Sequence, residues 1–503
     1  MRSDYRYRHY QNEELSLNSL PTSIYTQDPG STTRILGIEP ILFRRIMHLG
    51  WPVIIGMLSQ TAINIVDLLF IGRLPGDIAV PGAAAIFSSV ILIWVFGGFL
   101  SAISVGTQAI SARRFSEGKF SAAGKVLTNS LAVAIISSVV MFFAIYPFAG
   151  NLITFLTPLE RVQEIGESYT SLRLLGLPAM VMMAAYKSFY DGLGRVRVHM
   201  TIAIVMNIAN IALCYLLIFG FSIFGITVPA MDIDGAAIAA VIASYIGLFL
   251  MIMWTFRKED RRAFGVYNFS NLNWGVAWAV IKLSVWSGLA TVVLMAGVGL
   301  FNKIVGEVDK IEGLTEVNSS AASIVTNIML LVFMGCLAFG TSTATLVSQS
   351  VGAKNFSLAS RYGWQSALVA VYGVAIFGLV CFIFPEPVLQ VFMPHEAKAD
   401  SLKNLVVTHA LPSLRLVVMV LSPIAAGAMV LTQALYGAGK TRYVLIVEFL
   451  LHFFVLVPLA YLFAVVMGLG LIGCWISGII YGVGLLTATG IKFAAGGWKK
   501  TII

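Results

Sequence analysis

Charge is scarce in this sequence. Only 11% of its 503 residues are charged, while 58% are hydrophobic and 46 are glycines. Soluble domains carry about a quarter of their residues as charges, so this composition excludes an ordinary water-soluble protein. The four cysteines stand singly in apolar stretches, which gives no metal-ligand spacing and indicates packing residues. They are Cys214, Cys336, Cys381 and Cys474.

Long apolar runs fill most of the chain. A run of about 20 residues is needed to cross a hydrocarbon core of about 30 Å. Since lipid offers no partner to backbone amides, each run is expected to be helical. The sequence therefore predicts an all-α polytopic membrane protein with twelve transmembrane helices. They lie near 45–71, 83–107, 123–149, 168–190, 198–221, 235–256, 276–303, 319–343, 361–384, 405–436, 443–467 and 470–492.

Lysine and arginine gather in the links after every second run, for example at Arg113, Arg195, Arg261 and Lys440. The positive-inside rule places these links and both chain ends in the cytoplasm. The net charge of +9 is therefore explained by membrane topology and by attraction to anionic lipid headgroups, and no nucleic-acid partner is expected. Residues 1–40 lack the apolar run of a signal peptide, so we predict a mobile polar tail. The expected location is the plasma (inner) membrane.

The chain contains an internal repeat. "YDGLGRVR" at 190–197 resembles "LYGAGKTR" at 435–442, and a proline in each preceding run keeps the same offset of 245 residues. The matched pairs are Gly192 with Gly437, Gly194 with Gly439, and Pro178 with Pro423. Six runs per copy predict a parallel repeat of two six-helix bundles facing each other. The glycines are predicted to form tight turns, and the prolines to form either bends or fixed kinks.

The repeat also defines the predicted organisation of the chain. We expect a tail at 1–40, an N-terminal bundle at 41–257, a cytoplasmic linker at 258–275, a C-terminal bundle at 276–492 and a short tail at 493–503. A monomer embedded in the lipid bilayer is expected.

Several segments together resemble one transporter family. "LGWPVIIGMLSQTAINIVDLLFIGRLPG" at 49–76 is similar to the first span of the multidrug and toxic compound extrusion (MATE) family, with Pro52, Asp67 after a valine, and Gly72. "TATLVSQSVGAKNFSLA" at 343–359, the two glycine turns and "GAAIAA" at 235–240 also fit. The resemblance implies an exporter of small organic cations and amphiphiles. A proton or sodium gradient would drive it through rocking of the two halves, and no cofactor is expected.

Asp67 is a lone carboxylate inside an apolar run. One interpretation is an acid that faces the cleft and exchanges a coupling ion as the protein alternates between states. The other is an interfacial acid paired with Arg73. Gln60 and Asn64 share a helix face with Asp67, and Met57 lies one turn further along, so these three are expected to line the cleft.

The coupling ion is predicted from the neighbours that the resemblance implies. Asn207 occupies its expected place, but Ile211 and Ala240 stand where the resemblance implies an acid and a threonine. Asn210, next to the lost acid, is a partial substitute. Sodium needs several oxygen ligands, so protons are favoured, with sodium as the alternative.

The C-terminal half offers a second candidate pair. Glu448 and His452 are four residues apart and share one helix face. They are interpreted either as a proton relay or cation-binding pair, or as a structural pair held by hydrogen bonds.

Three function classes follow from these observations. The first is a cation-coupled exporter, favoured by the repeat and Asp67. The second is a flippase of the same superfamily for lipid-linked precursors. The third, a membrane-embedded transferase, lacks support because the short loops carry no cluster of catalytic residues, so no enzyme activity is expected.

Overall fold

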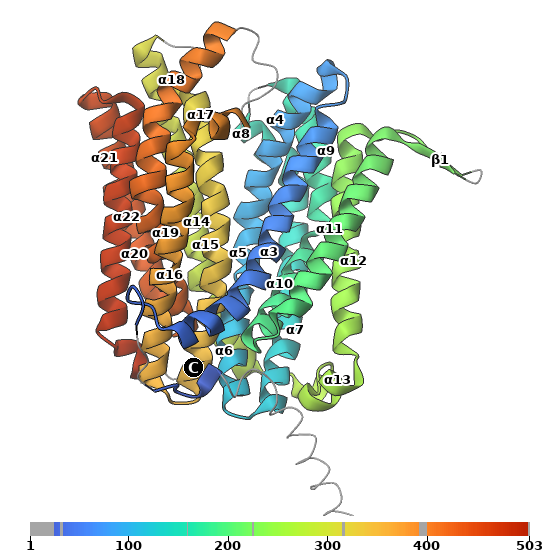
Figure 1. The fold of residues 1–503 in the computed structure, drawn as a ribbon. Helices are drawn as coiled ribbons and strands as arrows, with labels where there is room; N and C mark the ends of the chain where they lie inside the picture. Colours follow the sequence, from blue (N-terminus) through green and yellow to red (C-terminus); the bar gives the residue numbers. More distant parts are fainter. Residues whose placement is uncertain are drawn as a thin grey trace, which may run out of the picture.

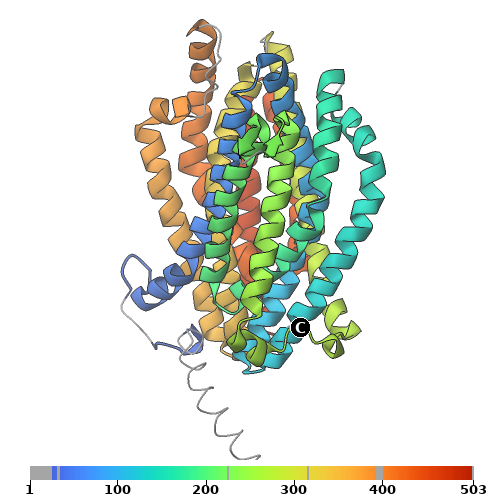
Figure 2. The ribbon, with the colours of Figure 1, turned by 90° about the vertical axis from the view of Figure 1, so that its right-hand side faces the viewer.

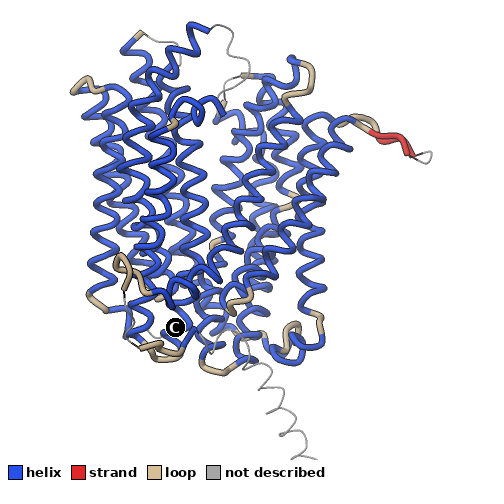
Figure 3. Tube along the Cα trace, viewed as in Figure 1, coloured by secondary structure: helices blue, strands red, loops and turns tan. Residues whose placement is uncertain are grey.

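The computed structural model describes residues 25–30, 34–157, 159–223, 226–313, 317–391 and 400–500. For some residues within these ranges the structure describes the backbone but not the side chain. They are 60–65, 67, 68, 76, 80, 222, 223, 226, 227, 269, 390, 391, 400–404 and 500. Helices make up nearly all of the described chain (Figure 3).

The N half contains six spans, several of them interrupted. Its helices are α3 (Pro40–Ile71), α4 (Gly76–Ile93), α5 (Phe99–Ser101), α6 (Ile103–Ser116), α7 (Phe120–Ile145), α8 (Ala149–Leu156), α9 (Glu160–Leu174), α10 (Leu177–Gly192), α11 (Val196–Phe219) and α12 (Asp232–Thr255). A π-helical segment, Trp94–Gly98, joins α4 to α5, and a 3-10 turn, Tyr146–Phe148, joins α7 to α8. The linker holds α13 (Lys258–Phe264) and a 3-10 turn, Phe269–Asn271.

The C half repeats this pattern. Its helices are α14 (Trp274–Glu312), α15 (Val317–Gly352), α16 (Phe356–Ile383), α17 (Pro385–Val391), α18 (Asp400–Leu416), α19 (Ser422–Gly437), α20 (Thr441–Leu451), α21 (Val457–Tyr461) and α22 (Gly470–Ala494). Three π-helical segments, Val417–Leu421, His452–Leu456 and Leu462–Val466, interrupt the tenth and eleventh spans. A 3-10 turn, Gly497–Lys500, follows α22.

Eleven helical stretches in the described ranges are long and apolar enough to cross a membrane. The remaining span is the α9–α10 rod, in which a turn at Leu175–Gly176 leaves helices of only 15 and 16 residues. The predicted all-α fold with twelve spans in two halves is therefore confirmed. Figure 1 shows the N half and the C half side by side, and Figure 2 shows their long helices running along a common direction.

One small departure from an all-α fold lies between α11 and α12. The strands β1 (Phe221–Ile223) and β2 (Ile226–Val228) pair antiparallel and project from the bundle (Figure 3). The local sequence "FSIFGITV" is rich in β-branched and aromatic residues, which favour an extended chain once the helix has ended at Gly220.

We call the end of the bundle that carries the connections α6–α7, α10–α11, α12–α14, α15–α16 and α19–α20 the basic end. It holds the arginines and lysines of these links, together with α13 and the C-terminus (Figure 1). The β1–β2 hairpin lies at the opposite end. Successive spans cross the bundle in opposite directions, so the link after every second span returns to the same face.

The two halves share a packed interface. Within the N half α3 packs against α11, and it also packs against α15 of the C half. Helix α14 likewise packs against α6 and α7 as well as α20. One apolar cluster joins residues of both halves, among them Leu49, Val53, Phe339 and Leu435. The halves are therefore in direct contact and not linked by the chain alone.

Part of the N-terminal segment is packed, where a mobile tail was predicted for residues 1–40. Tyr25 is 3% exposed, its hydroxyl lies 2.7 Å from His48 Nδ1, and its carbonyl accepts from Tyr362. Arg361 on α16 binds both Asp28 and Glu39. These contacts hold residues 25–30 and 34–39 against the C half. The tail prediction was wrong here because it rested on low hydropathy, which does not reveal an ion pair with a distant helix.

Candidate functional site

The two repeated glycine turns fold in the same way. Gly194 and Gly439 adopt φ angles of +77° and +79°, which a residue with a Cβ rarely takes. The amide of each donates to a carbonyl three residues earlier, at 2.9 Å. Gly192 and Gly437 serve a different purpose, because a Cβ there would lie 2.9 Å from Gln108 O and 2.4 Å from Ala344 O. The glycines thus allow α6 to pack on α10 and α15 to pack on α19.

Pro178 and Pro423 lie in the first turn of α10 and of α19. Before Pro178 the chain turns at Leu175–Gly176, and proline is tolerated in the first turn that follows because its missing N–H would be unpaired in any case. Before Pro423 the helix is continuous, because Val417–Leu421 is π-helical and the amide of Ser422 donates to Val417 O. Pro178 therefore begins a helix after a turn, whereas Pro423 follows a π-helical segment within one helix.

A polar face of α11 lies against α3 in the N half. The amide nitrogen of Asn207 donates to Ser59 Oγ at 2.7 Å, and Asn207 is 5% exposed. Its Oδ1 is buried and has no hydrogen-bond partner among the described residues. Asn210 is also buried, at 4% exposed. Met57, on the same stretch of α3, packs against the apolar cluster shared by the two halves.

The other residues of α3 that were predicted to line the cleft lie outside the side chains that the structure describes. Gln60, Asn64 and Asp67 lie on this helix, but their side chains are not among those described. Their roles stay predictions. Ser59 was not singled out from the sequence, because a serine inside an apolar helix carries no charge and gives no distinctive spacing.

In the C half, Glu448 and His452 do meet. His452 Nδ1 donates to the carbonyl of Glu448 at 2.8 Å and lies 3.3 Å from Glu448 Oε2. Tyr481 on α22 donates to the same Oε2 at 2.7 Å, and its ring stands edge-on to the imidazole with centroids 4.6 Å apart. His452 is only 1% exposed, since α14 packs directly on it at Gly297. The site is therefore a buried cluster of carboxyl, imidazole and phenol groups.

The π-helical segment that begins at His452 shapes this cluster. Such segments arise where one extra residue widens a helix turn, and they are frequent at functional sites. Pro458 follows six residues later and removes a backbone donor from the same span. Tyr481 was missed from the sequence because it comes from another helix.

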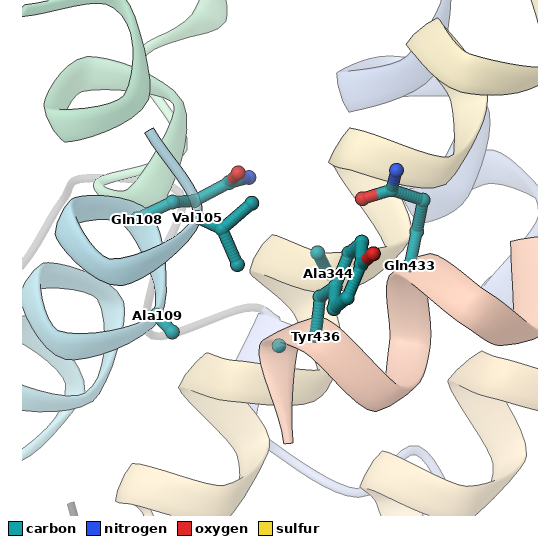
Figure 4. A pocket seen from close by; sticks show the side chains of 7 residues that line it. Val105, Gln108, Ala109, Ala344, Gln433 and Tyr436 are labelled. Carbon is teal, nitrogen blue, oxygen red and sulfur yellow. The ribbon is translucent and has the colours of Figure 1, made fainter. Parts of the chain in front are cut away.

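A small pocket lies between the halves near the basic end. Figure 4 shows Val105 and Gln108 of α6 on one wall, facing Ala344, Gln433 and Tyr436 of the C half. Its cavity volume is about 10 Å³. Sites for drug-sized ligands usually span about 300–1,000 Å³, so this pocket is far too small to hold such a ligand.

Beside this pocket, the end of α15 forms hydrogen bonds across the two halves, which we call the α15 seam. Gln108 Nε2 donates at 2.8 Å to both Thr341 O and Thr345 Oγ1. Thr345 in turn donates to the carbonyl of Asp191. The seam also contains the hydrogen bonds from Ser348 Oγ to Ala109 O and from Gln349 Nε2 to Gly192 O, both at 2.7 Å, and from Ser342 Oγ to Leu49 O at 3.2 Å.

The seam lies at one end of the interface. All the described side-chain hydrogen bonds between the N half and the C half come from the last turns of α15 or from the contacts of α16 with α3 and residues 25–39. The sequence did not reveal the seam, because it consists of neutral side chains and main-chain carbonyls.

The protein consists of two six-span halves that are related by a repeat. The halves contact each other at one end, and their spans carry buried titratable groups. These features define a membrane transporter of the parallel-repeat type. A sequence profile of the MatE family matches residues 52–216 and 311–462. The chain belongs to the MatE family, the multidrug and toxic compound extrusion transporters.

Individual relatives agree with this assignment. The chain is 25% identical to a probable multidrug resistance protein NorM of Thermotoga maritima, over 82% of this chain and 84% of the relative. It is 24% identical to a NorM of Bacillus cereus, over 88% and 92%. A structure described as the outward-facing conformation of a multidrug resistance MATE family transporter matches with a TM-score of 0.80, 19% identity and coverage of 96% and 99%. A transporter of the MOP superfamily from Pyrococcus furiosus also matches at 0.80, with 18% identity and the same coverage.

Proposed function

We propose that this protein is a secondary active antiporter that exports small organic cations or amphiphilic compounds in exchange for protons. The basic end faces the cytoplasm in this proposal, and both chain ends lie on that side, since basic links are retained there. The names of the NorM relatives as multidrug resistance proteins support the substrate class.

The observation that carries proton coupling is the cluster of Glu448, His452 and Tyr481. Ionisable groups within a membrane span are costly, and they mark ion or proton pathways. Here the carboxyl group is 12% exposed and contacts two further proton-carrying groups from its own helix and from α22. A proton can therefore be held or passed on within hydrogen-bond distance.

Transport follows from rocking of the halves. In this structure the α15 seam closes the basic end, so a substrate released toward the opposite side cannot return to the cytoplasm. If the seam broke and the opposite end closed, the substrate site between the two halves would be exposed to the cytoplasm. A proton can drive this cycle only if it binds the two states with different affinity.

Sodium is the second candidate, and one observation favours it. Asn207 Oδ1 is a buried oxygen with no hydrogen-bond partner in the described part of the chain, and a buried acceptor of this kind is suited to a cation. However, Ile211 and Ala240 supply no side-chain oxygen at two positions where the family resemblance implies ligands, which favours protons.

The test is export of ethidium from proteoliposomes under a separately imposed proton or sodium gradient. Wild type is compared with Glu448→Gln, which keeps an oxygen that accepts from Tyr481 but cannot exchange a proton, and with Asp67→Asn. Tyr443→Phe is the matched control, because the Tyr443 hydroxyl bonds to Ala488 O and not to this cluster. We expect a proton gradient alone to drive export. Glu448→Gln should lower the export rate at least tenfold, while Tyr443→Phe retains most of it.

Two results would overturn this proposal. Export driven by sodium alone would assign coupling to the polar face around Asn207. No export under either gradient, in protein that still folds, would refute cation antiport and favour a lipid cargo.

A further inference from the structure

Three titratable residues lie on the two helices that join where α10 turns into α11. Asp191 is the second-to-last residue of α10, and Lys187 lies one helical turn before it on the same face. His199 is in the first turn of α11. The turn between the helices is the glycine turn that occurs in both halves. It brings the start of α11 back beside the end of α10.

Two polar atoms of this group, Asp191 Oδ1 and His199 Nδ1, are buried and form no hydrogen bond to a described residue. Asp191 is 2% exposed and His199 is 4% exposed. The structure shows no hydrogen bond or ion pair from the half-buried Lys187 ammonium to a described residue. More than about 90% of buried polar groups in proteins are hydrogen-bonded, so neighbouring exceptions need an occupant such as water or a proton.

The fold does not require these charges. The same turn forms in the C half, where the positions that correspond to Lys187, Asp191 and His199 hold Thr432, Tyr436 and Val444. An uncharged set therefore supports an identical turn. This makes a purely structural role for the charged set a poor explanation of its presence.

The electrostatic surroundings are simple. Lys187 is the described charged group that acts on both Asp191 and His199. Helix α10 packs against α5, α6, α7, α11, α12 and α15, and among these the described residues of α5 and α15 carry no charge. The other charged groups of these helices have their own surroundings. Arg113 interacts with Glu117 and Arg114, and Arg195 forms an ion pair with Asp260. Arg197 acts on Tyr25 and His48, while Lys125 is exposed. Asp232 and Asp234 lie in the first turn of α12, at the opposite end of the bundle.

The group lies between the α15 seam and the polar face of α11. The carbonyls of Asp191 and Gly192 accept hydrogen bonds from Thr345 and Gln349. On the other side, His199 Cε1 lies 3.6 Å from where a Cβ on Gly56 would stand, so the imidazole packs on α3 one turn before Ser59. The carboxyl group is thus attached to the very turn that the seam holds closed.

We propose that Asp191, Lys187 and His199 form a proton-binding site whose occupancy is coupled to the α15 seam. With the seam closed, Asp191 is shut away from water, and desolvation disfavours its ionised form. When α15 separates from α10, water reaches the carboxyl group, which releases one proton to the basic end. The loss of this proton lowers the net charge of the group by one. This inference rests on the proposed proton antiport for its role in transport, but proton binding itself does not.

The experiment measures separation of the halves as a function of pH in liposomes without substrate. Spin labels are placed at Ser121→Cys and Ala353→Cys, two exposed positions at the basic end, one in each half. The four native cysteines, all buried, are replaced by alanine. Distance distributions between pH 5.5 and 8.5 give the fraction with the basic end open.

In the wild type we expect the open fraction to rise with pH as the site loses its proton. Asp191→Asn, which is neutral at all pH values, should remove this dependence and keep the basic end closed. Lys187→Gln should move the midpoint to higher pH, because loss of the ammonium makes the carboxylate harder to form. It also serves as the second variant if Asp191→Asn does not fold. Glu259→Gln is the control, since it removes an exposed acid at the same end.

The proposal is overturned if Asp191→Asn and Lys187→Gln both titrate like the wild type, or if Glu259→Gln changes the curve as much as they do. Since no substrate is present, a failure here is distinct from a failure of antiport. If Asp191→Asn loses the pH response, the proton-binding site is supported even if ethidium export proves to depend on sodium.

Discussion

From the α15 seam we predict how replacing the hydroxyl group of Thr345 by a methyl group shifts the balance between closed and open basic ends. Thr345 is fully buried, donates at 2.9 Å to the carbonyl of Asp191 and accepts from Gln108. Valine has the same shape but neither function. A typical intramolecular hydrogen bond contributes about 1 kcal/mol net, so loss of both contacts should destabilise the closed seam by about 1–2 kcal/mol. That corresponds to a change of about 5-fold to 30-fold in the ratio of closed to open basic ends.

The same helix provides the control. Thr343 is also fully buried, but among the described residues its hydroxyl bonds only to Phe339 O within α15. Distances between labels at Ser121→Cys and Ala353→Cys, measured at one pH, report the ratio for both variants. We expect Thr345→Val to increase the open fraction and Thr343→Val to leave it nearly unchanged. Equal effects of the two variants, or no effect of Thr345→Val, would refute the reasoning that hydrogen bonds across the halves close this end.

Replacing Gly437 by alanine is expected to lower the thermal stability of the detergent-solubilised protein by the equivalent of about 1–3 kcal/mol, because its Cβ would overlap Ala344 O. Gly373→Ala, on an open helix face, should be neutral or stabilising by up to about 1 kcal/mol, and equal losses would contradict the close-approach argument. Arg361→Gln should leave Glu39, which is 2% exposed, with a weaker partner and cost about 1–3 kcal/mol locally. Limited proteolysis within residues 25–39 should then be faster, and an unchanged rate would show that the ion pair does not hold this segment.

Periodicity and repetition predicted the architecture well. Hydropathy alone located the spans, because the membrane requires long apolar helices, and the offset of 245 residues identified the two equivalent turns. The helices nevertheless extend beyond the apolar runs. Helix α15 continues to Gly352 through a stretch of serines and threonines, since its polar end is buried against the other half and not against lipid.

The candidate site was predicted only where its residues share one helix. Glu448 and His452 are four residues apart, so helical spacing brought them together, whereas Tyr481 belongs to another helix and could not be found in this way. Asp191 was visible only as part of a turn motif, and its burial depends on the packing of several helices around α10. Burial and missing partners are properties of the folded chain, which spacing along the sequence does not encode.

The neutrality of the α15 seam has an electrical consequence. In the described structure, Val317–Gly352 carries no charged side chain, so separating α15 from α6 and α10 moves no formal charge of the helix through the membrane field. One elementary charge crossing 100 mV is worth about 2.3 kcal/mol, which exceeds the contribution of any single bond in the seam. Membrane voltage should therefore not act on the seam itself. Any electrogenic signal during turnover would report the ions and substrates carried, together with the titratable groups that bind them.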